Sequence, residues 1–285
     1  DRSIAIGLSA GQKGQGLESV AIGNLAGQTG QGTTCVAIGL LAGQTGQGDS
    51  SIAIGKFAGQ TSQGENSVAI GNQAGASAQG DSSIAIGKES GQTSQNSFAT
   101  AIGWRAGRTE QKMWSVAIGD WAGKDRQGTS SVAIGNGASV YDQKPYAISI
   151  GRSAGRNTQG AQSIAIGESA GRTGQGDRSI CIGSEAGKTE QGEESVAIGT
   201  QAGQTGQGIS SVAIGRFAGK TEQGTAGIAI GSGAGTTGQG RSSVAIGGWA
   251  GRTAQGQYAV AVGPAAGSLS QSDYSVAMGL QAGET

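Results

Sequence analysis

The side chains that most often carry catalysis or bind metals form no cluster in this chain. The sequence has no histidine, which removes the commonest general base and metal ligand. Its carboxylates, such as Glu89 and the neighbouring Glu193 and Glu194, lack the recessed pairing that acid–base catalysis needs. Glycine recurs too regularly for any nucleotide-binding spacing to be specific, and no regular aspartate column offers calcium ligands. We therefore predict a protein that is not an enzyme and holds no cofactor or metal.

Charge and cysteine content narrow the class further. The 19 basic and 19 acidic side chains balance, so nothing favours nucleic acid or an anionic membrane as a partner. No apolar run approaches the ~20 residues of a membrane helix, so this segment is expected not to insert into a membrane. Cys35 and Cys181 stand nine repeats apart, about 43 Å at roughly 4.8 Å per turn, too far to form a disulfide. Their redox state stays open, and the missing initiator Met indicates a processed product or a segment of a longer fibre.

A single 16-residue unit organises the whole chain. Eighteen copies run from Ser3 without insertion or deletion, the last one truncated, and the copy at Ser19–Thr34 reads SVAIGNLAGQTGQGTT. We number its positions 1 to 16 from that serine. A period of this length with strand-like runs and regular glycine is typical of a solenoid whose copies stack along one axis. Residues 1–285 are thus expected to form a single β-solenoid repeat domain.

Each copy predicts two strands. Positions 1 to 5 read Ser, Val or Ile, Ala, Ile, Gly, an alternation that favours a short strand with its aliphatic residues inward. The glycine at position 5 occurs in every copy, which predicts a turn or a close approach that a Cβ would forbid. Positions 8 to 14 read as a second strand, with Thr at position 11 and Gln at position 13 inward. The fold class is therefore all-β: a parallel β-solenoid, or β-roll, of about 18 coils of 16 residues.

Position 13 is glutamine in every copy that reaches it. Stacked identical amides can donate to and accept from one another along a column, as in cross-β assemblies. We interpret the column as a structural ladder, the alternative being a column displayed to a ligand. Its members are Gln15, Gln31, Gln47, Gln63, Gln79, Gln95, Gln111, Gln127, Gln143, Gln159, Gln175, Gln191, Gln207, Gln223, Gln239, Gln255 and Gln271.

A second feature that the copies share is a small residue at positions 1 and 3. If the aliphatic residues face inward, these Ser and Ala side chains face outward and make a flat strip. Such a strip suits close approach by another copy of the chain; the alternative is that small residues only flatten the sheet. The expected oligomer interface includes Ser19, Ala21, Ser51, Ala53, Ser115, Ala117, Ser195 and Ala197.

Aromatic residues gather at the predicted turns of a few consecutive coils. The same stretch replaces the usual glycine of position 14 with Asn96, Lys112 and Lys144. Exposed aromatic residues favour contact with a glycan or a protein, and the alternative is stacking along a ridge or packing against a neighbouring chain. The candidate ligand contacts are Phe98, Trp104, Trp114 and Trp121.

The recurring pentad SVAIG resembles the head repeats of YadA-type trimeric autotransporter adhesins. It occurs at Ser19, Ser67, Ser115, Ser131, Ser195, Ser211 and Ser243. The resemblance implies a left-handed β-roll, association of three chains, and a place at the cell surface where the head binds matrix proteins or host cells. The family's usual unit is shorter than 16 residues, and similar repeats occur in phage and giant-virus fibres, which keeps the source open.

Two functions remain in competition. The first is a structural or adhesive fibre segment, extracellular or exposed on a cell surface or virion, that forms a homo-oligomer, favoured as a trimer, and meets a host surface protein or glycan. The second is an ice-binding β-solenoid, which needs an exposed array of threonines. The expected inward direction of Thr29, Thr45 and Thr61 and the interruptions of their column disfavour it.

Overall fold

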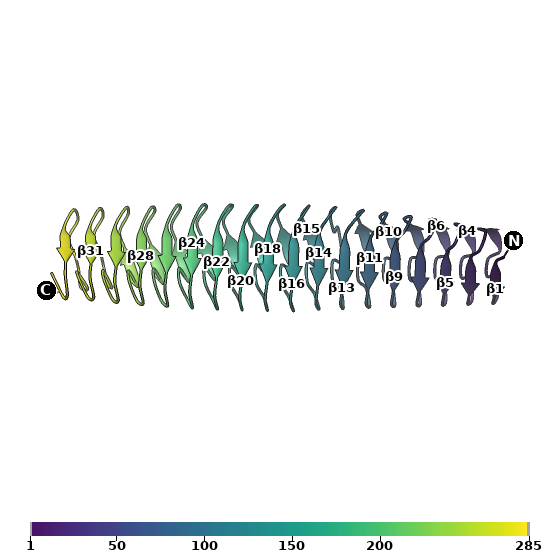
Figure 1. The fold of residues 1–285 in the computed structure, drawn as a ribbon, viewed down its shortest axis with the longest axis horizontal. Helices are drawn as coiled ribbons and strands as arrows, with labels where there is room; N and C mark the ends of the chain where they lie inside the picture. The colour runs from purple at the N-terminus through teal and green to yellow at the C-terminus, as the bar shows by residue number, and fades with distance from the viewer. Residues whose placement is uncertain (1, 284–285) are drawn as a thin grey trace. The chain divides into compact units, whose positions relative to one another are not determined.

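The computed structural model describes residues 2–283, and these contain short β-strands and turns but no helix. The predicted fold class is confirmed: a parallel β-solenoid of about 17 turns with a 16-residue period. The chain divides into two compact units, Asp1–Pro145 and Tyr146–Thr285, in each of which successive strands stack side by side (Figure 1). That the two units form one domain stays a prediction. Among the described residues, no helix is long and apolar enough to cross a membrane.

Positions 2 to 4 of each turn form a first parallel sheet, here called sheet A, whose strands pair 16 residues apart, as Val116 pairs with Val132. In the first unit its strands are β1 (Ile4–Ile6), β3 (Val20–Ile22), β5 (Val36–Ile38), β7 (Ile52–Ile54), β9 (Val68–Ile70), β11 (Ile84–Ile86), β13 (Thr100–Ile102), β14 (Val116–Ile118) and β16 (Val132–Ile134). In the second unit they are β18 (Ile148–Ile150), β20 (Ile164–Ile166), β22 (Ile180–Ile182), β24 (Val196–Ile198), β26 (Val212–Ile214), β28 (Ile228–Ile230), β30 (Val244–Ile246), β31 (Val260–Val262) and β32 (Val276–Met278).

Positions 11 to 13 form a second parallel sheet, sheet B. In the first unit its strands are β2 (Lys13–Gln15), β4 (Thr29–Gln31), β6 (Thr45–Gln47), β8 (Thr61–Gln63), β10 (Ser77–Gln79), β12 (Thr93–Gln95), β15 (Asp125–Gln127) and β17 (Tyr141–Gln143). In the second unit they are β19 (Asn157–Gln159), β21 (Thr173–Gln175), β23 (Thr189–Gln191), β25 (Thr205–Gln207), β27 (Thr221–Gln223) and β29 (Thr237–Gln239).

Sheet B of the first unit is interrupted between β12 and β15, where Thr109 forms only isolated bridges to Thr93 and Asp125. The glycine of position 14 normally lies against the next turn: a Cβ on Gly48 would lie 2.6 Å from the nitrogen of Glu65. Lys112 stands at this position and must push the neighbouring turn away. Its N–H reaches the carbonyl oxygen of Gln127 at 3.1 Å, against 2.8 Å for the matching bond from Gly48 to Gln63.

The glycine at position 5 occupies a backbone conformation that other residues rarely adopt. Gly7 has φ +133°, and a Cβ built on it would lie 2.4 Å from the carbonyl oxygen of Gly23 in the next turn. Both the left-handed φ and the contact exclude a side chain. The close approach predicted from the constancy of this glycine is confirmed.

The predicted direction of the first strand was wrong. Positions 1 and 3 face the interior, and Ser19, Ala21, Ser51, Ala53, Ser115, Ala117, Ser195 and Ala197 are fully buried. They therefore cannot form the outward strip that we expected to carry an oligomer interface. The interior opposite position 3 is too thin for a larger residue: a Cβ on Gly107 would lie 3.2 Å from the Cβ of Ala101. The Val and Ile residues of positions 2 and 4 consequently face outward.

The predicted inward direction of the threonines was also wrong. Thr29, Thr45 and Thr61 are exposed, while the glutamine two residues later is buried. The residue between them is left-handed, with φ 64° at Gly30 and 53° at Ser62. A left-handed residue breaks the two-residue alternation of a strand, so both neighbours need not face the same side. Only position 13 of this strand points inward.

The glutamines of position 13 bridge the two sheets. Gln111 is fully buried, and its Nε2 donates to the carbonyl oxygens of Thr100 at 2.8 Å and Ser115 at 3.3 Å. The first of these bonds, to position 2 of the same turn, recurs for every glutamine of the column. Bonds from amide to amide join Gln79, Gln95, Gln111 and Gln127 into one run. The main chain of sheet A is thus the column's constant partner.

The side-chain oxygen of the buried glutamine explains why position 9 is also usually a glycine. A Cβ on Gly107, at position 9, would lie 2.5 Å from the Oε1 of Gln111. With its φ of +50°, this glycine lets the amide oxygen occupy the space that a side chain would fill. Positions 9 and 13 are therefore constrained together.

Replacing one amide by its carboxylic acid tests this arrangement. Gln111→Glu keeps the shape but, when ionised, places a carboxylate beside the Thr100 carbonyl, which costs several kcal/mol. Burial raises the pKa of the introduced acid above its unfolded value, so stability should be highest below the ordinary Glu pKa and fall as pH rises. Thermal unfolding followed by circular dichroism between about pH 4 and about pH 8 measures this.

The control is Gln111→Met, which has a similar volume and no titratable group. It should lower the unfolding temperature by an amount that does not change with pH. A Gln111→Glu protein as stable as the parent at neutral pH would contradict the buried position of this side chain.

Candidate binding surfaces

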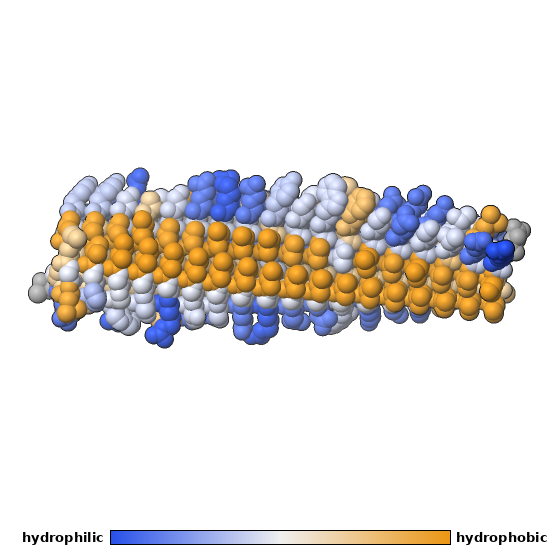
Figure 2. All heavy atoms as spheres, viewed as in Figure 1, coloured by the Kyte–Doolittle hydropathy of each residue, from blue (hydrophilic) through white to orange (hydrophobic). Residues whose placement is uncertain are grey.

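An aliphatic face covers the outside of sheet A in each unit. The isoleucines of position 4 keep about a third of their surface exposed, for example Ile118 at 37% in the first unit and Ile198 at 36% in the second. The Val and Ile residues of position 2 lie beside them, half-buried. Figure 2 shows these side chains as an orange band bordered by polar turns. This face, made of positions 2 and 4, is the main apolar surface of each unit.

The four aromatic candidates do not form one site. Phe98 and Trp114 stack with ring centroids 6.2 Å apart, and both lie in the turn that precedes sheet A. Trp104 and Trp121 meet edge to face at 5.6 Å, and both lie in the turn that follows it. The two pairs therefore border opposite edges of the aliphatic face.

Basic side chains extend the second pair into a longer arrangement. The Arg105 guanidinium lies 5.0 Å from the ring centroid of Trp104 and 5.4 Å from that of Trp121. The Lys124 ammonium lies 4.9 Å from Trp121 and 5.3 Å from Tyr141. We call Trp104, Arg105, Trp121, Lys124 and Tyr141 the aromatic ridge. Sequence analysis found its two tryptophans and missed Tyr141 and the two cations, although the places of the cations one and three residues after a tryptophan were a visible signal.

Glu89 holds the start of the ridge in place. Its side chain is 10% exposed and accepts a hydrogen bond from Nε of Arg105 at 2.7 Å. Arg108 and Lys88 lie 3.7 and 3.8 Å from the same carboxylate. The bond from Arg105 and the charges of all three cations hold the pKa of Glu89 below its usual range, although burial opposes this shift. One carboxylate thus meets three cations.

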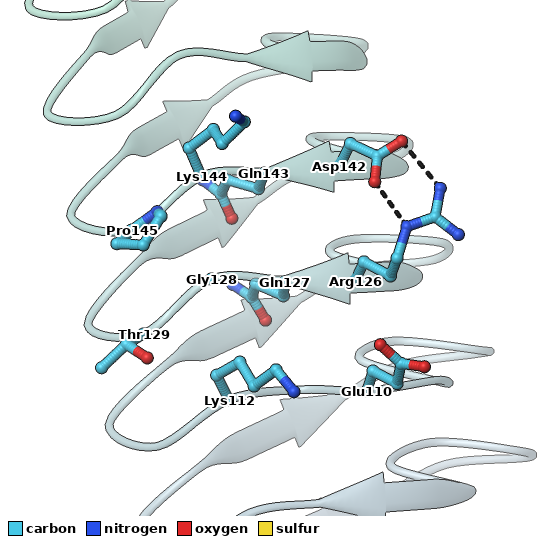
Figure 3. Close-up of a pocket in the computed structure, with 10 residues that line it drawn as sticks. All are labelled: Glu110, Lys112, Arg126, Gln127, Gly128, Thr129, Asp142, Gln143, Lys144 and Pro145. Carbon is cyan, nitrogen blue, oxygen red and sulfur yellow. Dashed lines mark hydrogen bonds and ion pairs between the residues drawn. The ribbon is translucent and has the colours of Figure 1, made fainter.

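A depression in the surface of the first unit lies beside the break in sheet B. It has a volume of about 340 Å³ and lies between Lys112 and Lys144, with Gly128 between them. Figure 3 shows the Arg126 guanidinium turned to the Asp142 carboxylate, and its two bonds are 2.5 and 2.7 Å long. Because these two charges already pair with each other, they offer no acid or base for catalysis.

A second amide ladder lies on the surface of the first unit. Gln12, Gln28, Gln44 and Gln60 stand at position 10, and the Nε2 of each of the last three donates to the Oε1 of the glutamine one turn before it at 3.1 to 3.3 Å. Beside it run the exposed threonines of β4, β6 and β8. We had not predicted this ladder, although four successive glutamines at one position were its signal in the sequence.

Neither cysteine suggests chemistry. Cys35 and Cys181 are free and fully buried, each in place of a small interior residue. Burial raises the pKa of the Cys181 thiol far above its ordinary value, so it stays protonated and unreactive. Within residues 2–283, no three His, Cys, Asp or Glu side chains gather as metal ligands would.

Comparison with known families gives one result. Two segments of the chain, residues 62–90 and 254–282, match the YadA head domain repeat. One segment lies in each unit. Each segment contains two strands of sheet A, whose outward side chains belong to the aliphatic face. The resemblance indicated by the SVAIG pentad is thereby confirmed. No curated protein matches the chain.

The charge cluster at Glu89 generates a testable pH dependence. Because the folded pKa of Glu89 is lowered, its ionised form stabilises the fold above the ordinary value of 4.5, and this contribution is lost as pH falls through the folded pKa. Glu89→Gln should therefore destabilise the chain by about 1–3 kcal/mol at neutral pH, and the difference should shrink below pH 4.5. Glu65→Gln, at an exposed site in the same unit, should have little effect. A Glu89→Gln effect that is constant with pH would contradict the ionised cluster.

Proposed function

We propose that this chain, which carries YadA head repeats, is a segment of a surface adhesin or fibre that associates with two further copies through the aliphatic face of sheet A. The observation that carries the proposal is the direction of positions 2 and 4. The interior takes the small residues, so the aliphatic ones are left outside, as at Ile54 and Ile246.

The aliphatic face favours a stable partner. The largest apolar patch of a monomeric protein is typically about 300–600 Å², and covering such surface stabilises by about 25 cal/mol per Å². An identical chain offers the same 16-residue spacing of Val and Ile, so side chains can interdigitate turn after turn. The number three comes from the family, whose heads associate around a common axis. We place the assembly outside the cell or on a virion, where its uncovered faces meet a host protein or glycan.

Introducing charge on the aliphatic face tests the assembly. The parent chain should have a mass near three times its 27.8 kDa by light scattering. Ile118→Glu combined with Ile198→Glu places one carboxylate on the face of each unit, where burial between chains would cost several kcal/mol per charge. We expect this variant to scatter as a monomer with an unchanged β circular dichroism spectrum, because both side chains lie outside the interior.

The control carries the same charges on the other sheet. Thr45→Glu combined with Thr205→Glu alters exposed residues of β6 and β25 and should keep the parent mass. A monomeric parent chain, or equal dissociation of both variants, would overturn association through the aliphatic face.

Ice binding stays as a second candidate because the threonines are exposed. Thr29, Thr45 and Thr61 point to solvent beside the surface amide ladder, which removes one of the two reasons that had disfavoured this function. The column remains interrupted, by Asp125 and Tyr141 among others. Ice binding requires thermal hysteresis in the parent that Thr45→Lys reduces, measured by nanolitre osmometry. We expect none, and a clear hysteresis would favour this function over the fibre.

A further inference from the structure

The aromatic ridge begins at one edge of the aliphatic face, and its chemistry calls for a different ligand. Trp104 and Trp121 stand at the turn after sheet A, while Tyr141 begins β17 of sheet B. Trp104 and Tyr141 keep 41% and 38% of their surface exposed. Around them lie charged groups, with Lys88 and Glu89 on one side and Asp125, 3.0 Å from Lys124, on the other. A stable protein interface needs about 800 Å² per partner and an apolar centre. Three rings separated by cations are too small and too polar for that role.

The ridge is held in one conformation before any ligand arrives. Arg105 is bonded to Glu89 and lies against both tryptophans, and its side chain is 27% exposed. Lys124 lies between Trp121 and Tyr141 with 12% of its side chain exposed. Side chains that are already immobile lose little entropy on binding. Flat, rigid ring faces of this kind suit the C–H faces of pyranose rings, while the neighbouring polar groups suit their hydroxyls.

The charge beside the ridge indicates which sugars fit. The Glu89 carboxylate lies near three cations, Lys88, Arg105 and Arg108. With Lys124, Asp125 and Asp120, whose carboxylate accepts a hydrogen bond from the N–H of Trp104 at 3.3 Å, the ridge and its surroundings hold four cations and three carboxylates, so one positive charge remains in excess. Lys88 and Arg108 are the accessible ones, with side chains 60% and 35% exposed. A carboxylate on the ligand would restore the balance with charge-assisted hydrogen bonds.

We propose that the aromatic ridge of the first unit binds an oligosaccharide that carries a carboxylate, with sugar rings stacked on Trp104 and Tyr141 and the carboxylate at Lys88 and Arg108. This rests on the proposed function, which it deepens by naming the ligand class. The two can fail separately, because chain association is read from the mass and the ridge is read from sugar binding.

Titration calorimetry of the full chain tests the proposal with sialyllactose and tetragalacturonate as acidic probes and lactose as the neutral counterpart. We expect at least one acidic probe to bind and lactose to bind at least tenfold more weakly. Trp104→Ala should weaken the acidic probe at least tenfold. The matched control is Trp249→Ala, which removes a tryptophan from an equivalent turn of the second unit, where Arg252 lies 4.6 Å from its ring, and should leave binding unchanged.

A second variant keeps the test independent of folding. Lys88→Gln combined with Arg108→Gln removes two of the three cations near Glu89 but keeps the hydrogen bond from Arg105 to that carboxylate. It should weaken the acidic probe, with the loss greatest at low salt, while the light-scattering mass stays that of the parent. Binding of neither acidic probe by a correctly assembled chain would overturn the proposal. So would equal binding of lactose, equal losses in Trp104→Ala and Trp249→Ala, or a ridge that contacts only a protein.

Discussion

The hydrogen bond from each buried glutamine to the main chain of sheet A is the interaction on which the rest of the structure depends. It spans the interior of every turn, from Gln111 to Thr100 in one case, and so sets the distance between the two sheets. At that distance Ala101 lies close to Gly107 of the opposite wall, and only small side chains fit beside the extended glutamines. The fold is therefore held by polar bonds and close main-chain contacts, with little of the apolar core that stabilises ordinary domains.

A thin interior has a direct consequence for assembly. Alternation along a strand sends position 3 inward and positions 2 and 4 outward, so filling the interior with alanine leaves Val and Ile on the surface. The apolar surface that another fold would bury inside one chain can here be buried only between chains. Stability and association are then linked: whatever covers the face of Ile118 and its neighbours also stabilises the folded turns. The proposed association of chains would therefore add the apolar burial that the thin interior does not supply.

The sequence was sufficient for the period, the two strands of each turn and the close approach at Gly7, because each leaves a periodic signal. The sequence was not sufficient to predict which side of each strand faces the interior. Alternation of Val20, Ala21 and Ile22 is the same pattern whichever side is buried, and the usual preference for aliphatic residues inside gave the wrong answer, since the interior width follows from the glutamine bonds and not from hydropathy. The prediction that the threonines face inward failed for a local reason. The residue at position 12 is left-handed, which Gly30 and Gly46 at that position already indicated.

Regularity and specificity lie on different parts of this molecule. Positions 1 to 5, 9 and 13 repeat almost unchanged because each is constrained by the turn before and after it, and a face built from them can recognise only something with the same period. The turns at positions 6, 7 and 10 carry no such constraint, so they can differ from one copy to the next without disturbing the stack. Trp104, Arg105 and Lys124 stand at these free positions, and their contacts run across consecutive turns. A uniform scaffold can therefore hold one irregular group of side chains rigidly, which is what selective recognition of a small ligand requires.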